Sequence, residues 1–371
     1  MKKRALVIVL DSVGCGHAPD AEHYGDSGAD TLGHLFERIA DLDLPGLESL
    51  GLYGLLGIES RVAPLRDSRA FRLTESSAGK DTTTGHWELM GCQIEEPFFT
   101  CEAFPDDFVS ELELLVGTKF LGNKVASGTE ILRELGNLHC ATGYPILYTS
   151  ADSVLQIAAH EGLFGLERLL DICRQARTLL DRMDMKVGRV IARPFLGDDA
   201  DSFHRTFNRH DCSLTPERTV LNRLKENGVI VTGVGKISDI FAGEGITESF
   251  PTEDNRGGMD RIEELWSERP ERDRLIFANL VDFDSLYGHR RNPRGYADCL
   301  MEFDRWLVGF LGKVEHGDLL IITADHGNDP YHSGTDHTRE QVPCLVLSAC
   351  IDSAEIARFS DVGRRIERYF G

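Results

Sequence analysis

The segment from Leu319 to Glu340 has the residue types and spacing best suited to chemistry. It opens with an apolar run that ends at Thr323 and then changes to acids, histidines and glycines. A run of this kind is typical of a strand buried on both faces. Asp325 and His326 would lie at the carboxyl end of that strand, with His337 in the loop beyond. Because Asp and His bind divalent metals, and open α/β sheets hold their sites at such ends, the segment predicts a metal site.

Two other buried-strand patterns are also associated with aspartates. The run from Ala5 to Leu10 is followed by Asp11, and we expect a strand from Leu275 to Asp284 that ends in its own aspartate. All carboxyl ends of a parallel sheet lie at one edge, so the side chains that follow these strands should converge there. The expected metal ligands are Asp11, Asp284, His289, Asp325, His326 and His337.

Three carboxylates and three imidazoles are enough to hold two divalent ions in one site. Aspartates gathered there without a cation would repel one another and raise each other's pKa, which favours bound metal. Each residue taken alone also fits an ordinary role, as a turn, a helix cap or a polar surface loop. The joint pattern favours the metal site.

Three consecutive threonines offer a nucleophile for such a site. Thr82, Thr83 and Thr84 follow Asp81, and a helical pattern begins near His86. A hydroxyl at a helix N-terminus lies in a field that stabilises an alkoxide or an attached phosphate. Threonine and aspartate are also simply good helix caps, and chemistry alone does not choose among the three hydroxyls. Two metals with a hydroxyl nucleophile suit phosphoryl transfer.

The chain has 371 residues, which is enough for two domains or for one domain with an insertion. Buried strands alternate with helices at both ends and predict an α/β core with a mainly parallel sheet and helices on both faces, over 1–97 and 215–371. Between them, 98–214 reads as a smaller inserted α+β domain. Among its cations is a cluster of four arginines that form either a solvated face or a phosphate-binding surface. They are Arg189, Arg193, Arg205 and Arg209.

The net charge of −21 argues against general affinity for nucleic acid or for an anionic membrane surface. No apolar stretch approaches the length of a membrane span. The nine cysteines are scattered and contain no C-x-x-C spacing, so we expect reduced thiols in a cytoplasmic protein. Nothing in the sequence points to an obligate protein partner.

Eight segments, which follow one another along nearly the whole chain, resemble the phosphopentomutase family, the bacterial, metal-dependent type within the alkaline phosphatase superfamily. The segments are DSVGCGHAPDA (Asp11 to Ala21), GKDTTTGHWE (Gly79 to Glu88), TSADSVLQIAAHE (Thr149 to Glu161), GRVIARPF (Gly188 to Phe195), NRHD (Asn208 to Asp211), GKISDIF (Gly235 to Phe241), NLVDFDSLYGHRR (Asn279 to Arg291) and TADHGNDPYHSGTDHTRE (Thr323 to Glu340).

The resemblance implies an isomerase with an alkaline-phosphatase-like core and an inserted cap. It implies two Mn²⁺ ions, and interconversion of ribose 1-phosphate with ribose 5-phosphate, and of the 2-deoxy forms, in nucleoside salvage. By the family's motifs, one ion would be held by Asp284, His289 and His337. The other would be held by Asp11, Asp325 and His326.

The resemblance also assigns the nucleophile and the substrate contacts. Because the family's threonine directly follows a Lys-Asp pair, it selects Thr82 as the nucleophile. The residues implied to contact the sugar phosphate are Ser150, Asp152, Arg189 and Arg205 in the cap and Lys236 in the core.

In the implied mechanism a sugar bisphosphate first phosphorylates Thr82. The threonine gives its phosphoryl group to ribose 5-phosphate and takes the other group back from the resulting 1,5-bisphosphate. A cap that excludes water would protect the phosphothreonine. The alternatives on the same core are a metal-dependent phosphatase and a phosphoglycerate-mutase-like enzyme. A non-catalytic metal-binding protein is the alternative from another class.

Overall fold

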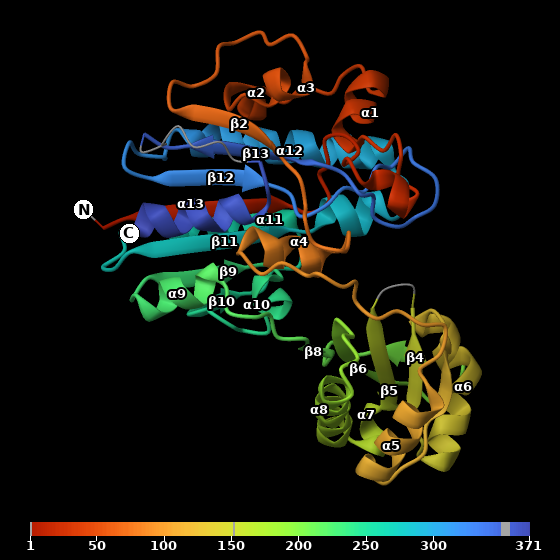
Figure 1. The fold of residues 1–371 in the computed structure, drawn as a ribbon. Coiled ribbons are helices and arrows are strands. Elements are labelled where there is room, and N and C mark those ends of the chain that lie inside the picture. Colours follow the sequence, from red (N-terminus) through yellow and green to blue (C-terminus); the bar gives the residue numbers. More distant parts are fainter. Residues whose placement is uncertain (1, 151–152, 350–356) are drawn as a thin grey trace. The chain divides into compact units, whose positions relative to one another are not determined.

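The computed structural model describes residues 2–150, 153–349 and 357–371. The chain divides into two compact units, Met1–Glu96 with Pro216–Gly371 and Pro97–Thr215, so the second unit interrupts the first in sequence. Each unit is built around its own sheet (Figure 1). That the inserted unit serves as a substrate-holding cap stays a prediction.

A seven-stranded sheet forms the centre of the first unit, in the order β10-β9-β11-β1-β12-β13-β2. The strands are β1 (Arg4–Leu10), β2 (Ser68–Leu73), β9 (Ile230–Val234), β10 (Glu248–Phe250), β11 (Arg274–Leu280), β12 (Leu319–Thr323) and β13 (Val342–Leu347). Pairings from β10 to β12 are parallel, whereas β13 pairs antiparallel with both β12 and β2. All residues of β1, β9 and β12 are buried, which explains their continuous apolar sequences. The expected α/β fold with a mainly parallel sheet is confirmed.

Helices cover both faces of this sheet (Figure 1). On one face α13 contacts α4 and α9, and on the other α11 contacts α12. The helices of the unit are α1 (Thr31–Arg38), α2 (Pro45–Ser49), α3 (Leu52–Leu56), α4 (Thr82–Leu89), α9 (Val220–Glu226), α10 (Ile237–Ile240), α11 (Asn255–Ser267), α12 (Pro293–Leu311) and α13 (Ser360–Phe370), with a short 3₁₀ turn at Ala21–Tyr24. Among the helices of the described ranges, none combines the length and the apolar character needed to cross a membrane.

The strand expected from Leu275 to Asp284 is wrong at its carboxyl end. Strand β11 stops at Leu280, and Asp284 lies in a single π-helical turn, Phe283–Gly288. Apolar residues continue past the end of the strand because Phe283 packs into the core against Tyr296 and Phe303. A buried turn and a buried strand therefore have the same apolar sequence here.

Two strands of the sheet were missed because they do not look buried. The outer strands β2 and β10 are both partly exposed, and their sequences mix charged and apolar residues.

The second unit contains a six-stranded sheet with parallel and antiparallel pairings, in the order β3-β4-β5-β6-β7, with β8 also paired to β6. Its strands are β3 (Leu121–Val125), β4 (Ile146–Thr149), β5 (Val154–His160), β6 (Arg189–Leu196), β7 (His204–Arg205) and β8 (His210–Ser213). Its helices are α5 (Asp106–Val116), α6 (Gly128–Thr142), α7 (Glu161–Phe164) and α8 (Leu166–Arg182). Two apolar clusters form its core, and one of them joins α5 and α8 to the sheet.

Helix α4 approaches the loop after β12 unusually closely. Its N-cap is Asp81, whose carboxylate accepts hydrogen bonds from the backbone N–H groups of Thr83 and Thr84. At Gly85 a β-carbon would collide with the backbone carbonyl of Asp325. Only glycine allows the helix to lie this close to the carboxyl edge of the sheet.

We predict that Gly85→Ala lowers the free energy of unfolding by about 1–3 kcal/mol, because helix and loop must separate to admit the methyl group. Gly309→Ala in α12 is the matched control, since a β-carbon there meets nothing within 4 Å. The control should raise stability by about 0.5–1 kcal/mol through the higher helix propensity of alanine. Urea unfolding of both variants measures the difference, and equal effects would contradict the close packing at Gly85.

Candidate metal centre

Two adjacent strands place the first group of ligands. Strands β1 and β12 pair in parallel with Val9 opposite Thr323, so the residues that follow them emerge side by side. Asp11 comes directly after β1, and Asp325 and His326 follow β12 by a few residues. The structure therefore brings these three side chains to one edge, as parallel pairing requires.

The ligand atoms of Asp11, Asp325 and His326 all lie within 4.8 Å of one another, and all three residues are buried. His326 Nε2 is 3.5 Å from Asp11 Oδ1 and 3.4 Å from Asp325 Oδ2. Backbone and amide groups hold the two carboxylates. Ser12 N–H donates to Asp325 Oδ1 at 3.1 Å, and Asn279 Nδ2 donates to Asp11 Oδ2 at 3.0 Å.

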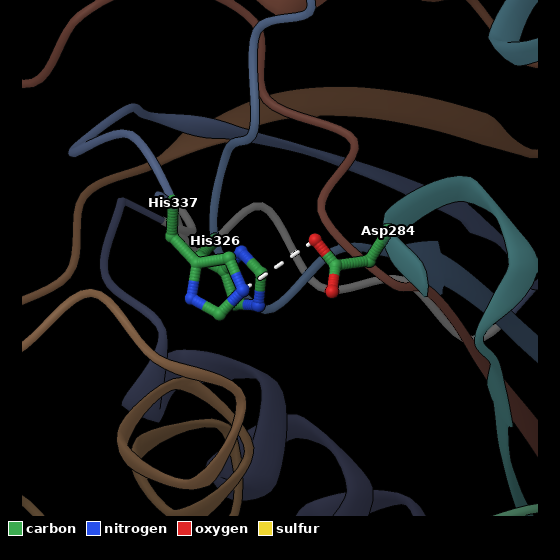
Figure 2. Close-up of side chains that lie close together, drawn as sticks. All are labelled: Asp284, His326 and His337. Carbon is green, nitrogen blue, oxygen red and sulfur yellow. Dashed lines mark ion pairs between the residues drawn. The ribbon is translucent and has the colours of Figure 1, made fainter. Parts of the chain in front are cut away.

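A second group shares His326 with the first. Asp284, His326 and His337 offer ligand atoms within 4.8 Å of one another, and Figure 2 shows their side chains turned toward a common centre. His337 Nε2 is 3.4 Å from Asp284 Oδ1, and the rings of His326 and His337 stack with centroids 3.9 Å apart.

His289 borders this second group. Its Nε2 lies 3.1 Å from Asp284 Oδ2 and 3.1 Å from His337 Nε2. All six residues expected as metal ligands therefore gather at one edge of the sheet. Which ion each of them holds stays a prediction.

The electrostatics of the centre fit a cation. Burial, together with the charges of Asp325 and Asp284, raises the pKa of Asp11 to about 8. Burial acts to lower the pKa of His337, but the carboxylate of Asp284 outweighs it and raises that pKa to about 10. Asp11 Oδ1 is buried and accepts no hydrogen bond, and buried Asp325 Oδ2 lies 3.1 Å from His86 Nδ1 and 3.4 Å from His326 Nε2. Buried carboxylate oxygens without donors beside imidazole nitrogens are a suitable donor set for divalent metal.

The structure distinguishes two of the three candidate threonines. Thr82 is the first residue of α4, and its hydroxyl lies 3.1 Å from His326 Nε2, the group shared by both sets of ligands. The hydroxyl of Thr84 instead bonds back to the carbonyl and the carboxylate of Asp81. Of the two, Thr82 is thus the hydroxyl that faces the metal centre.

Two buried polar residues of the centre were missed in the sequence. His86 Nδ1 lies 2.8 Å from the carbonyl of Thr82 and 3.1 Å from Asp325 Oδ2. Asn279, in β11, holds Asp11 as described above. A signal for His86 was present, because it lies one helical turn after Thr82 and so shares its face of α4. No comparable signal marks Asn279, since an amide in an apolar strand also fits a structural role.

The residues expected to bind substrate lie in both units. Lys236 follows β9, and its charge acts to lower the pKa of Asp11, so it lies near the metal centre. Ser150 follows β4 in the second unit, and Asp152 lies outside the described residues. Arg189 is the first residue of β6. Arg205, in β7, pairs with Phe195 near the other end of β6, roughly 20 Å from Arg189 along the strand.

The other two members of the expected arginine cluster, Arg193 and Arg209, have partners of their own. Arg193 Nε donates to Gln156 Oε1 at 2.9 Å, and Arg209 pairs with the carboxylate of Asp211. Burial, together with the charges of Arg209 and Arg205, lowers the pKa of Arg193 to about 10. These three guanidinium groups are close enough to repel one another, which favours an anion among them.

Comparison with known proteins agrees with the geometry. Residues 3–370 match the family model of the metalloenzyme superfamily. Phosphopentomutases from Symbiobacterium thermophilum and Acetivibrio thermocellus are each 50% identical to the chain, covering all of it and 95% and 96% of their own lengths. The chain belongs to the phosphopentomutase family. The resemblance stated from the motifs is confirmed, and membership of this family makes the chain an isomerase.

The comparisons also bear on the fold and on metal binding. A protein of known structure from Pyrococcus horikoshii matches 100% of the chain and 98% of its own length with a TM-score of 0.52 at 14% identity, which shows a shared fold. Membership of the metalloenzyme superfamily, together with the two ligand groups, supports divalent metal binding by this phosphopentomutase family member.

We predict that metal binding to the metal-free protein at pH 7 releases about two protons. Asp11, with a pKa near 8, and His337, with a pKa near 10, carry protons there, and a metal ligand must lose its proton. Affinity should therefore rise with pH, by up to roughly tenfold per pH unit for each proton displaced. Calorimetric titration with Mn²⁺ in buffers of different ionisation enthalpy counts the protons.

The matched pair for this experiment is His337→Gln and His316→Gln. The first should lower the proton count by about one, because the displaced imidazole proton is gone. The second changes a histidine exposed on the surface and should leave the count unchanged. A binding enthalpy independent of the buffer would contradict the prediction.

Proposed function

We propose that the protein interconverts ribose 1-phosphate and ribose 5-phosphate, and the 2-deoxy forms, in nucleoside salvage and catabolism in the cytoplasm. One observation supports it most: the Thr82 hydroxyl lies 3.1 Å from the imidazole that joins the two ligand groups. A hydroxyl in this position is suited to accept and return a phosphoryl group. The 50% identity to phosphopentomutases supplies the sugar phosphate as substrate class.

The proposed resident metal is Mn²⁺, with two ions per chain. Carboxylate oxygens and imidazoles without a thiolate suit manganese among the divalent metals. One ion would be held by Asp11, Asp325 and His326, and the other by Asp284, His289 and His337. Bound there, the ions would lower the pKa of the nearby hydroxyl and offset charge on phosphoryl oxygens.

The chain itself orients the nucleophile. Thr82 opens α4, so the positive end of the helix dipole favours an anionic phosphate ester at its side chain. His86, one turn further along, fixes the backbone of Thr82 through its carbonyl. The close contact at Gly85 sets the distance from α4 to the loop that carries Asp325.

In the proposed cycle, phosphorylated Thr82 gives its phosphoryl group to the O1 hydroxyl of ribose 5-phosphate. The phosphate–threonine bond breaks, the proton of the O1 hydroxyl ends on the threonine oxygen, and a 1,5-bisphosphate forms. After this intermediate turns around, the Thr82 hydroxyl attacks its 5-phosphoryl group, which leaves ribose 1-phosphate and restores the phosphothreonine. A sugar bisphosphate is needed once, as an activator that phosphorylates Thr82.

The second unit is the proposed cap that binds the sugar phosphate and excludes water. Ser150, Asp152, Arg189 and Arg205 would contact the substrate, together with Lys236 of the core. The surroundings of Arg205 support an anion site. Its guanidinium packs against Gly128, the first residue of α6, so a cation and the positive end of a helix dipole lie together. The guanidinium and the positive end of the helix dipole repel each other, and an anion bound between them would relieve this repulsion.

We predict that Thr82→Ala lowers the rate of ribose 1-phosphate turnover by more than roughly a thousandfold, because the hydroxyl that carries the phosphoryl group is lost. Thr83→Ala is the control and should stay near wild type, since Asp81 is bonded by the backbone of Thr83 and not by its hydroxyl. The assay contains Mn²⁺ and a catalytic amount of sugar bisphosphate, and follows ribose 5-phosphate and free phosphate.

This assay also separates the alternatives. Free phosphate as the main product would make the protein a phosphatase. If ribose 1-phosphate is not converted, a parallel assay with phosphoglycerate as substrate tests for a phosphoglycerate mutase. Full activity in Thr82→Ala would contradict the proposed nucleophile. Mass spectrometry of the bisphosphate-treated wild type should find the phosphate on Thr82.

We predict that Arg205→Met raises KM for ribose 5-phosphate by roughly tenfold to a hundredfold, the loss expected for a charge-assisted hydrogen bond to phosphate. Arg174→Met, on the exposed side of α8, is the matched control and should leave KM unchanged. Steady-state kinetics at saturating Mn²⁺ measures both variants. An unchanged KM in Arg205→Met would remove this residue from the substrate site.

A further inference from the structure

Arg291, just beyond the π-helical turn, has an unusual set of hydrogen-bond partners. Its guanidinium donates to the backbone carbonyls of Gly288, Gly334 and Asp336 and to the side-chain oxygen of Asn328. These acceptors come from three separate segments of the chain. Within the described residues it forms no ion pair with a carboxylate, so it serves as a clamp on neutral oxygens.

Each of the three segments either carries a ligand of the second metal group or contacts one. Asn328 Nδ2 donates to Asp284 Oδ1 at 2.7 Å, and Asn328 Oδ1 accepts from Arg291. The Asn328 amide thus links the guanidinium to the Asp284 carboxylate. The carbonyl of Asp336 lies immediately before His337. Gly288 ends the turn that contains Asp284 and precedes His289.

The loop ahead of His337 is fixed at three consecutive residues. Arg291 binds the carbonyls of Gly334 and Asp336, and His289 Nδ1 lies 2.7 Å from the carbonyl of Thr335 between them. A bond at Nδ1 leaves His289 Nε2 directed at Asp284, the orientation that a metal ligand needs. The guanidinium and the imidazole thus hold this loop together.

The backbone of Arg291 is itself strained. Its φ angle is 49°, in the left-handed region that residues other than glycine rarely adopt. Such a conformation costs on the order of 1 kcal/mol and persists where other contacts impose it. Two backbone hydrogen bonds close the turn here, from Arg291 N–H to the carbonyl of Gly288 and from Asn292 N–H to that of Tyr287, and the guanidinium contacts hold the side chain.

We propose that Arg291 is a positioning residue that assembles Asp284, His289 and His337 for metal binding. The first group is held by other contacts among the described residues: Asp11 by Asn279, Asp325 by the backbone of Ser12, and His326 Nδ1 beside the carbonyl of Gly327 at 3.1 Å. Loss of the guanidinium therefore weakens one of the two metal sites and spares the other. This inference rests on the proposed function, which requires both ions.

The test is equilibrium binding of Mn²⁺ to metal-free Arg291→Met, measured by calorimetry at fixed pH. We expect the wild type to bind two ions. The variant should keep one site near wild-type affinity. At the other site its affinity for Mn²⁺ should fall by roughly tenfold to a hundredfold, as is typical when a residue that orients metal ligands is removed. Arg290→Met is the matched control, since Arg290 is exposed and next in sequence, and it should bind as wild type does.

Two further measurements separate positioning from general loosening. Arg291→Lys should behave like Arg291→Met, because a single ammonium group cannot replace a planar guanidinium that bonds several acceptors. Arg291→Lys also replaces Arg291→Met in the test if Arg291→Met does not fold. Millimolar methylguanidine should restore the weakened site in Arg291→Met.

The possible outcomes are distinct. Two wild-type sites in Arg291→Met, or equal weakening of both sites, would overturn the inference and leave the proposed function intact. A wild-type protein that binds no Mn²⁺ would overturn the proposed function, and this inference with it. Loss confined to one site and rescued by methylguanidine would establish the positioning role.

Discussion

The mutual repulsion of buried carboxylates at one sheet edge is the constraint on which the rest of the structure depends. Parallel pairing of β1 and β12 brings Asp11 and Asp325 together, and burial, with the charges of Asp325 and Asp284, raises the pKa of Asp11. The surrounding groups do not neutralise this charge with a lysine or arginine salt bridge in the described residues. They hold each carboxylate by an amide or a backbone N–H and leave oxygens without a donor, which is how a protein keeps a place for a divalent cation.

The nucleophile is placed by the same constraint. Helix α4 must bring a hydroxyl to the carboxyl edge without adding another negative charge, and a neutral threonine at its first turn does so. The negative charge of Asp81 is directed at the backbone of α4, where it serves as the cap. The positive end of the dipole and the imidazole of His326 therefore meet at Thr82, and glycine at position 85 makes the approach possible.

The central strands of the sheet could be predicted from the sequence, and the outer strands could not. Strands such as β1 and β12 are buried on both faces, so their apolar runs carry an unambiguous signal. At an outer strand such as β2 exposure removes that signal. Asp284 was misplaced because burial of Phe283 continues the apolar pattern into a turn, and periodicity does not distinguish the two over so few residues. Arg291 reads as a surface cation, and only the folded loops show what it binds.

The insertion enters and leaves the first unit beside the helix that carries the proposed nucleophile. The chain departs after α4 and returns at α9, where the N–H of Val220 donates to the carbonyl of Met90 at the end of α4. Both connections are thereby anchored to one helix, and neither disturbs the parallel strands that position the aspartates. On the proposed function this placement has a physical reason. A phosphothreonine must react with the sugar and not with water, and attachment of the insertion at the far end of the same helix leaves Thr82 and the charged edge undisturbed.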